Sequence, residues 1–261
     1  MARRWLPDDS FPMIVAHRGA SSTHPENTLP AFAAALELGA PMVELDVRLT
    51  ADGVPVVLHD PDVSRTTDGT GYVHELTAAQ VAELNGGSER DPAHVPRLAE
   101  VLELVSGRGG VAIEVKNIPG EPAFQADGES IVEASLAEIE RVGFEGPVLV
   151  LSFNPRSIAV AKALVPDVGT GFLTTGLVDP RDALAHVIEA GHEMLLPGSF
   201  PLAAAGAGFV GEAHDAGVRI GTWTVDDEPT LTAFLGWGVD AVASNDPGMA
   251  LAVLAAYRAR A

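Results

Sequence analysis

Two acidic residues alternate with apolar residues in one short hydrophobic stretch of the chain. Residues 42–47 read Met-Val-Glu-Leu-Asp-Val, so the two-residue period of a β-strand places Glu44 and Asp46 on the same face. In a sheet of parallel strands both faces are buried. Two ionised carboxylates side by side in such a place repel each other and lose hydration, so they require a cation, a basic partner or a shared proton.

A second apolar stretch repeats this arrangement. Residues 113–116 read Ile-Glu-Val-Lys, which places Glu114 and Lys116 on one face near the carboxyl end of a strand. Buried salt bridges are one interpretation, but a single lysine cannot neutralise three inward-facing carboxylates. The sequence therefore predicts a divalent cation bound by Glu44, Asp46 and Glu114. Ligand sets made of oxygen alone favour Mg²⁺ or Ca²⁺ over zinc.

Two histidines that follow apolar runs could supply acid–base chemistry. His17 and Arg18 come directly after the apolar residues 13–16, and His59 follows residues 54–58. A histidine can transfer a proton near neutral pH, and an arginine offers paired donors that match phosphate oxygens. Alone, each histidine could be structural, but beside a carboxylate cluster we expect one to act as general base and the other as general acid. The sequence does not decide which is which.

The elements that must position these residues alternate regularly along the chain. Short apolar runs are separated by longer amphipathic stretches, which is the pattern of parallel strands joined by crossover helices. Eight such strands predict one (β/α)8 barrel, a TIM barrel, spanning residues 1–261, with its active site at the carboxyl ends of the strands. The strands are expected near Met13–Ala16, Met42–Val47, Val111–Val115, Val148–Leu151, Gly169–Phe172, Met194–Leu196, Arg219–Thr222 and Ala241–Ala243.

Helices are expected between these strands, and one connection is unusually long. After the second strand, Asp52-Gly53 indicates a turn, Val54–Leu58 indicates another strand, and the following residues are polar and turn-rich. We expect residues 52–98 to form a small subdomain inserted into this connection. The helices are predicted at Leu29–Leu38, Leu98–Val105, Glu129–Val142, Pro155–Leu164, Pro180–Ala190, Leu202–Ala216, Glu228–Trp237 and Pro247–Arg258.

Several other polar or aromatic residues have a structural and a functional interpretation. Trp223 lies at the end of the seventh predicted strand, where we expect it to form a wall of the pocket, with capping of the barrel as the alternative. Asn27 or Thr28 is expected to be the N-cap of the first helix. The remaining histidines lie in predicted loops or on helix flanks, and we expect surface or packing roles for His24, His74, His94, His186, His192 and His214.

Composition narrows the class of partner. The 16 basic and 36 acidic residues give a formal net charge of −20, which would repel nucleic acid and anionic membrane surfaces and favours a small diffusing substrate. There is no cysteine, so no disulfide, thiolate nucleophile or cysteine-bound zinc is possible. Residues 1–12 lack the apolar core of a signal peptide and no run of 18 apolar residues occurs, so we expect a cytoplasmic protein without stable membrane association. A homo-oligomer is compatible with the sequence, which does not define one.

Taken in order, the motifs resemble those of the glycerophosphodiester phosphodiesterase family. Each string is weak alone, but the ordered set spans residues 14 to about 250 and is highly specific. The strings are His-Arg-Gly at 17–19, Pro-Glu-Asn-Thr at 25–28, Glu-Leu-Asp-Val at 44–47, Asp-Gly at 52–53, Val-Val-Leu-His-Asp at 56–60, Arg-Thr-Thr-Asp-Gly at 65–69, Ile-Glu-Val-Lys at 113–116, Trp-Thr-Val at 223–225 and Gly-Val-Asp at 238–240.

The resemblance implies hydrolysis of a glycerophosphodiester to an alcohol and sn-glycerol 3-phosphate, on a TIM barrel with a small insertion after strand two. It implies Mg²⁺ or Ca²⁺ bound by Glu44, Asp46 and Glu114, acid–base roles for His17 and His59, phosphate binding by Arg18 and Lys116, and an alcohol side lined by Trp223. The chain departs from the family at 244–247, where Ser-Asn-Asp-Pro replaces the usual Thr-Asp-Xaa-Pro. We expect this change to affect the last loop of the mouth and substrate preference, without touching the metal or histidine positions.

Other activities remain as alternatives at this stage. The same site could act as a phospholipase D on lysophospholipids or sphingomyelin, although no exposed apolar anchor or basic face for lipid is expected. A barrel that binds a phosphate ester without turnover is a second alternative. An aldolase or isomerase would need a Schiff-base lysine, and Lys116 lies among acids that would keep it protonated. The sequence also leaves open whether water or the neighbouring glycerol hydroxyl attacks phosphorus.

Overall fold

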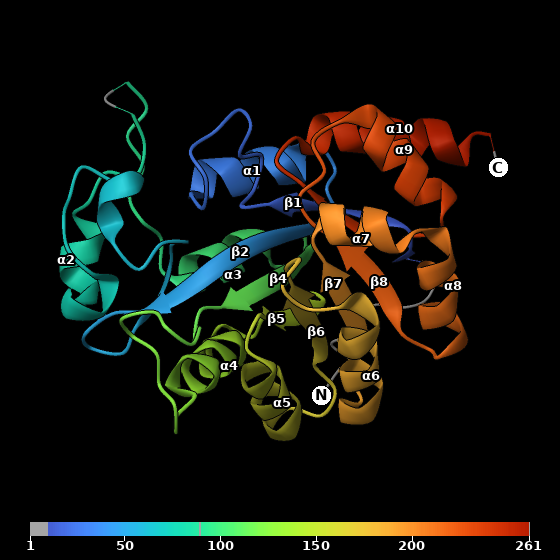
Figure 1. The fold of residues 1–261 in the computed structure, drawn as a ribbon. Coiled ribbons are helices and arrows are strands. Elements are labelled where there is room, and N and C mark those ends of the chain that lie inside the picture. Colours follow the sequence, from blue (N-terminus) through green and yellow to red (C-terminus); the bar gives the residue numbers. More distant parts are fainter. Residues whose placement is uncertain (1–9, 89, 261) are drawn as a thin grey trace.

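The chain folds into a closed barrel of parallel strands surrounded by helices (Figure 1), as the sequence predicted. The computed structural model describes residues 10–88 and 90–260. Among these residues, eight parallel strands pair side by side, and β1 closes the ring by pairing with both β2 and β9. The strands are β1 (Met13–His17), β2 (Met42–Leu49), β4 (Gly110–Val115), β5 (Val148–Ser152), β6 (Gly169–Thr174), β7 (Met194–Pro197), β8 (Arg219–Thr222) and β9 (Ala241–Ser244).

The helices lie on the outside of the barrel and begin at recognisable capping residues. Asn154, Asp179 and Asp246 each accept a hydrogen bond from a backbone N–H of the first turn, and each is followed by proline. Proline suits this position because its fixed φ is helical and its missing N–H would have no partner there. The helices are α1 (Leu29–Glu37), α3 (Leu98–Val105), α4 (Ser130–Val142), α5 (Pro155–Leu164), α6 (Pro180–Ala190), α7 (Ser199–Ala205), α8 (Ala207–Asp215), α9 (Glu228–Gly236) and α10 (Pro247–Arg258).

One predicted helix is wrong. The sequence indicated a single helix over residues 202–216, but the chain forms α7 and α8 with a break at Gly206. Gly206 has φ 78° and ψ 175°, a conformation that is accessible almost only to glycine. The apolar periodicity continues across the break, so it concealed the change of direction.

The connection between β2 and α3 has a small core of its own. It contains β3 (Pro55–Val57), which pairs antiparallel with β2, two short 3₁₀ helices and α2 (Ala78–Ala82). Figure 1 shows this segment extending to one side of the barrel. Its buried apolar cluster consists of Val56, Leu58, Val63, Val73, Val81 and Val95.

Apolar side chains line the inside of the barrel beneath its mouth. Leu196 of β7 fits there because β6 and β8 carry glycine beside it: a Cβ at Gly171 would lie 2.5 Å from Leu196 Cδ1. The inner cluster comprises Met13, Val15, Met42, Ala112, Leu149, Leu151, Leu173, Met194, Leu196, Ala241 and Ala243.

No helix within the described residues is long and apolar enough to cross a membrane.

Candidate active site

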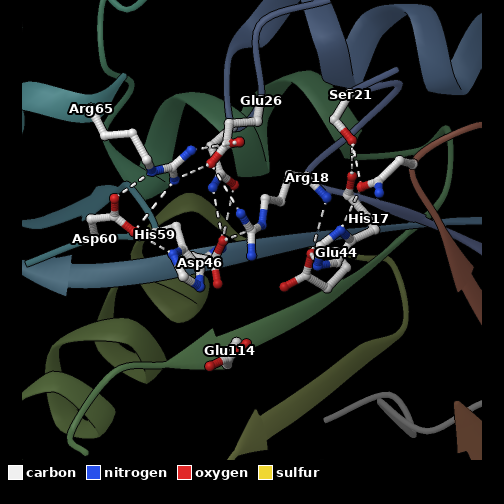
Figure 2. A network of polar contacts seen from close by, with 12 residues as sticks. His17, Arg18, Ser21, Glu26, Glu44, Asp46, His59, Asp60, Arg65 and Glu114 are labelled. Carbon is white, nitrogen blue, oxygen red and sulfur yellow. Dashed lines mark hydrogen bonds and ion pairs between the residues drawn. The ribbon is translucent and has the colours of Figure 1, made fainter. Parts of the chain in front are cut away.

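Three carboxylates from two neighbouring strands converge at the mouth of the barrel. Glu44 and Asp46 extend from β2 and Glu114 from β4, and the parallel register places Asp46 beside Glu114. One oxygen of each carboxylate can be chosen so that all three lie within 4.8 Å of one another. All three residues are buried, Asp46 completely. Figure 2 shows them facing a common space, which is the arrangement expected from the two-residue period.

Basic residues compensate only part of this negative charge. Lys116 Nζ lies 2.8 Å from Asp46 Oδ1 and also contacts Glu114, while Arg18 Nε lies 3.1 Å from Asp46 Oδ2. Burial favours the neutral form of Asp46, but Lys116 and Arg18 outweigh it and hold the pKa of this carboxyl well below its usual range. The salt-bridge interpretation therefore applies to Asp46.

Basic residues compensate Glu44 and Glu114 less completely than Asp46. Burial, reinforced by the charge of Asp46, raises the pKa of Glu44 to about 8. Burial also raises the pKa of Glu114 to about 7, although Lys116 opposes the shift. A divalent cation among the three oxygens would favour the ionised form of both glutamates. The donor set and its unbalanced charge therefore fit a divalent cation.

His17 stands at the end of β1 beside the carboxylates. Its Nε2 lies 3.9 Å from Glu44 Oε2, and its Nδ1 lies 2.7 Å from the side-chain oxygen of Asn245. Burial, with the neighbouring charge of Arg18, lowers the pKa of His17. The backbone N–H of Arg18 donates to Glu44 Oε2 at 3.0 Å, so the turn after β1 also holds the glutamate.

His59 follows β3 on the other side of the mouth and belongs to a chain of ion pairs. Its Nδ1 lies 2.6 Å from Asp60 Oδ1, and Asp60 is also bound by Arg65. Arg65 donates to Glu26 Oε1 at 2.7 Å, and Arg18 donates to the same oxygen at 3.0 Å. The chain of contacts in Figure 2 thus ties His59 and the inserted segment to the loop after β1. Burial, followed by the charge of Lys116, lowers the pKa of His59.

Several of these residues were not predicted from the sequence. Thr28 caps α1 as expected, but Asn27 instead points into the site, where its Nδ2 donates to Asp46 Oδ2 at 2.8 Å. Asn27 is 3% exposed and has a φ of 59°, so a strained turn places it there. Its position in the Pro-Glu-Asn-Thr string was the available signal. Glu26 of the same string, Asp60 and Arg65 were also overlooked as site residues.

The expectation that the change at 244–247 leaves the histidines untouched is wrong. Asn245 lies in that segment and contacts His17 directly. The cause is the closure of the barrel, which places the loop after β9 next to the loop after β1.

A cavity of about 160 Å³ opens beneath these groups. Trp223 forms part of its wall, as expected: the indole Nε1 donates to the carbonyl of Leu196 at 2.9 Å, and the ring packs edge-on against Phe153 at 5.3 Å. All predicted site residues except Asp46 line this cavity. Its polar side contains His17, Arg18, Glu44, His59, Glu114 and Lys116, and its opposite side includes Leu151, Phe153, Leu173, Leu196 and Trp223.

Comparison with known proteins identifies the family to which this chain is similar. The sequence model of the glycerophosphoryl diester phosphodiesterase family matches residues 17–249. A glycerophosphodiester phosphodiesterase from Caldanaerobacter subterraneus is 35% identical over 241 residues, which cover 90% of this chain and 94% of the relative.

Two solved structures have a similar fold. A phosphodiesterase from Oleispira antarctica, solved in complex with the product sn-glycerol 3-phosphate, has a TM-score of 0.85 at 28% identity and covers 95% of this chain and 98% of its own. The structure of a glycerophosphodiester phosphodiesterase from Agrobacterium tumefaciens has a TM-score of 0.76 at 28% identity, and the match covers 92% of this chain and 99% of that chain.

Proposed function

The chain belongs to the glycerophosphoryl diester phosphodiesterase family, and we propose that it hydrolyses glycerophosphodiesters to an alcohol and sn-glycerol 3-phosphate at the mouth of its barrel. The observation that carries this proposal is the cluster of three buried carboxylates at the mouth, two of which line one cavity together with both histidines. The two kinds of group serve different steps of phosphodiester cleavage. The complex of the Oleispira protein with sn-glycerol 3-phosphate supports the choice of substrate class.

The carboxylates are assigned to metal binding. Enzymes of this family depend on a divalent metal, and Glu44, Asp46 and Glu114 would hold Mg²⁺ or Ca²⁺ in this chain. When bound, the cation supplies positive charge that stabilises the phosphoryl oxygens as negative charge grows on them. Asn27 keeps Asp46 in place through the amide hydrogen bond.

Arg18 and Lys116 are assigned to binding the phosphate. Burial disfavours the charged form of both, but the surrounding carboxylates, Asp46 above all, raise the pKa of each. Both side chains therefore keep their positive charge at neutral pH, at the cavity wall where the anionic diester would bind.

The two histidines are assigned to proton transfer, and their partners suggest the order. A general base must start neutral and a general acid must start protonated. The carboxylate of Asp60 favours the protonated form of His59 and opposes the lowering of its pKa by burial and Lys116, whereas the partner of His17 Nδ1 is a neutral amide. We assign His17 as the base that deprotonates the nucleophile and His59 as the acid that protonates the leaving oxygen.

The test measures release of glycerol 3-phosphate from a panel of diesters, with and without a chelator. Activity is expected only when Mg²⁺ or Ca²⁺ is present. His17→Ala and His59→Ala should each lose activity, whereas the control His94→Ala changes a partly exposed histidine beside Glu100 and should not. Full activity in either of the first two variants would remove that histidine from the mechanism. Detection of a cyclic glycerol phosphate would identify the glycerol hydroxyl, instead of water, as the nucleophile.

A second candidate activity, on lysophospholipids, is favoured by two exposed apolar side chains at the mouth. The expectation that the chain offers no apolar anchor is wrong, because Leu177 is 94% exposed and Phe200 is 82% exposed. Leu177 lies in the loop after β6, and Phe200 lies in the first turn of α7, which follows β7. The N–H of Gly198 donates to the carbonyl of Thr174, so the two segments adjoin. An acyl chain leaving the apolar side of the cavity would meet this rim.

Comparing rates on glycerophosphocholine and a lysophosphatidylcholine tests this second candidate. Replacing both Leu177 and Phe200 by Ser should slow only the lipid reaction. The control Leu164→Ser changes a leucine that is 52% exposed at the end of α5, away from the mouth. Equal loss on both substrates would argue against lipid contact. Cytoplasmic location stays a prediction from the sequence, which does not define the oligomeric state.

A further inference from the structure

The amide of Asn245 bridges His17 and an aspartate outside the cavity. Its Oδ1 lies 2.7 Å from His17 Nδ1, and its Nδ2 donates to Asp226 Oδ2 at 2.7 Å. Asp226 comes from the loop between β8 and α9, and Asn245 from the loop between β9 and α10. The loops after β8 and β9 therefore meet beside the imidazole at the end of β1.

The contacts fix the orientation of this amide. An ionised carboxylate only accepts hydrogen bonds, so the amide nitrogen of Asn245 must face Asp226 and the amide oxygen must face His17. The hydroxyl of Ser21 also lies 2.9 Å from this oxygen, but its single proton has a nearer acceptor in the backbone carbonyl of His17 at 2.7 Å, so the orientation rests on Asp226. A carbonyl oxygen cannot donate, so the proton of the neutral imidazole lies on Nδ1.

Asp226 is itself held by the segment that it orients. Its Oδ1 accepts from the backbone N–H of Asn245 at 2.7 Å and from the hydroxyl of Ser244 at 3.0 Å. The backbone of Asn245 is anchored in turn, because its carbonyl accepts from the N–H of Ser22 at 2.9 Å. The side chain of Asn245 is therefore held beside His17, and Asp226 decides which end of the amide faces the ring.

We propose that Asp226, acting through Asn245, is a positioning residue that fixes the tautomer of His17. With the proton on Nδ1, the lone pair of Nε2 is available on the side of the ring where Glu44 lies, 3.9 Å away. This inference rests on the proposed role of His17 as the general base, because only a free Nε2 can accept a proton there.

The arrangement also gives the two histidines different partners. His59 Nδ1 contacts the carboxylate of Asp60 directly. The amide of Asn245 lies between His17 Nδ1 and the carboxylate of Asp226. A neutral partner orients the ring without favouring its protonated form as strongly as a carboxylate would.

An isosteric exchange of the two groups tests the proposal in the Mg²⁺-loaded enzyme. In Asp226→Asn, an amide N–H₂ group would face the N–H₂ of Asn245, so Asn245 should turn over and present its nitrogen to His17. We expect kcat to fall on the order of 10- to 100-fold with KM nearly unchanged. In the double variant Asp226→Asn with Asn245→Asp, residue 245 would accept from residue 226 and from His17, so the proton should return to Nδ1. We expect kcat to recover in part, because a carboxylate partner also favours the protonated ring.

Nitrogen NMR of labelled histidine gives an independent readout. The neutral ring of His17 should be protonated at Nδ1 in the unchanged enzyme, shift toward Nε2 in Asp226→Asn and return in the double variant. Asp227→Asn is the matched control: it makes the same charge change one residue away, and asparagine can replace aspartate as the N-cap of α9.

The outcomes separate the two levels of the proposal. An unchanged tautomer and kcat in Asp226→Asn, in a folded protein by circular dichroism, would overturn the positioning role. If the tautomer shifts as expected while His17→Ala retains full activity, the positioning role stands and the assignment of His17 as base fails.

Discussion

Divalent-cation binding to the acid cluster should strengthen as the pH rises. Burial raises the pKa of Glu44 to about 8 and that of Glu114 to about 7, so each must lose a proton before it can act as an anionic ligand. Lys116 and Arg18 lower the pKa of Asp46, which is ionised throughout this range and adds no pH dependence.

The size of the effect follows from these values. At pH 7, roughly one tenth of Glu44 and roughly half of Glu114 would be ionised, whereas at pH 9 both would be mostly ionised. The product of these fractions predicts a gain of about 20-fold in apparent affinity, or about 2 kcal/mol. At pH 7, between one and two protons should be released for each cation bound, roughly.

Isothermal titration calorimetry with Ca²⁺, in buffers of different ionisation enthalpy, measures both the affinity and the protons released. Glu44→Gln should weaken binding and remove most of the pH dependence. Glu133→Gln, at an exposed position on α4, is the control and should change neither. An affinity that stays level between pH 7 and pH 9, with no proton release, would refute the raised pKa values of Glu44 and Glu114.

Three further predictions concern stability and positioning. With a chelator present, Glu44→Gln should have a higher melting temperature than the unchanged protein, and the difference should grow from pH 5 to pH 8. A carboxyl group with a raised pKa loses its stabilising effect as the pH rises toward and through that pKa. A difference that stays constant with pH would contradict this. Arg65→Ala should lower kcat on the order of tenfold, because it frees Asp60, the partner of His59. The control Arg141→Ala breaks an exposed ion pair on α4 and should leave kcat unchanged. Equal rates in the two variants would exclude the ion pairs around Asp60 from catalysis. Gly206→Ala should cost about 1–3 kcal/mol of unfolding free energy in thermal denaturation, and a neutral effect would show that the break between α7 and α8 tolerates a side chain.

The sequence by itself determined the barrel and the inward-facing acids. Strand periodicity is a local property, since alternate residues must face opposite sides of any strand. Glu44 and Asp46 could therefore be assigned to one face of β2, and Glu114 to the corresponding face of β4. The order of eight apolar runs then implied that their carboxyl ends meet at one mouth.

Only the tertiary structure decided which groups support these residues. Asn245 lies 228 residues from His17 along the chain, and Arg65 lies 39 residues from Glu26. Such pairs have no local signature, because they form only when the ring of strands closes and brings the loops together. The same holds for Asn27, whose pattern equally suits a helix cap until the position of Asp46 is known. Periodicity fixes which way a side chain faces, whereas its partner is fixed by the packing of segments distant in sequence.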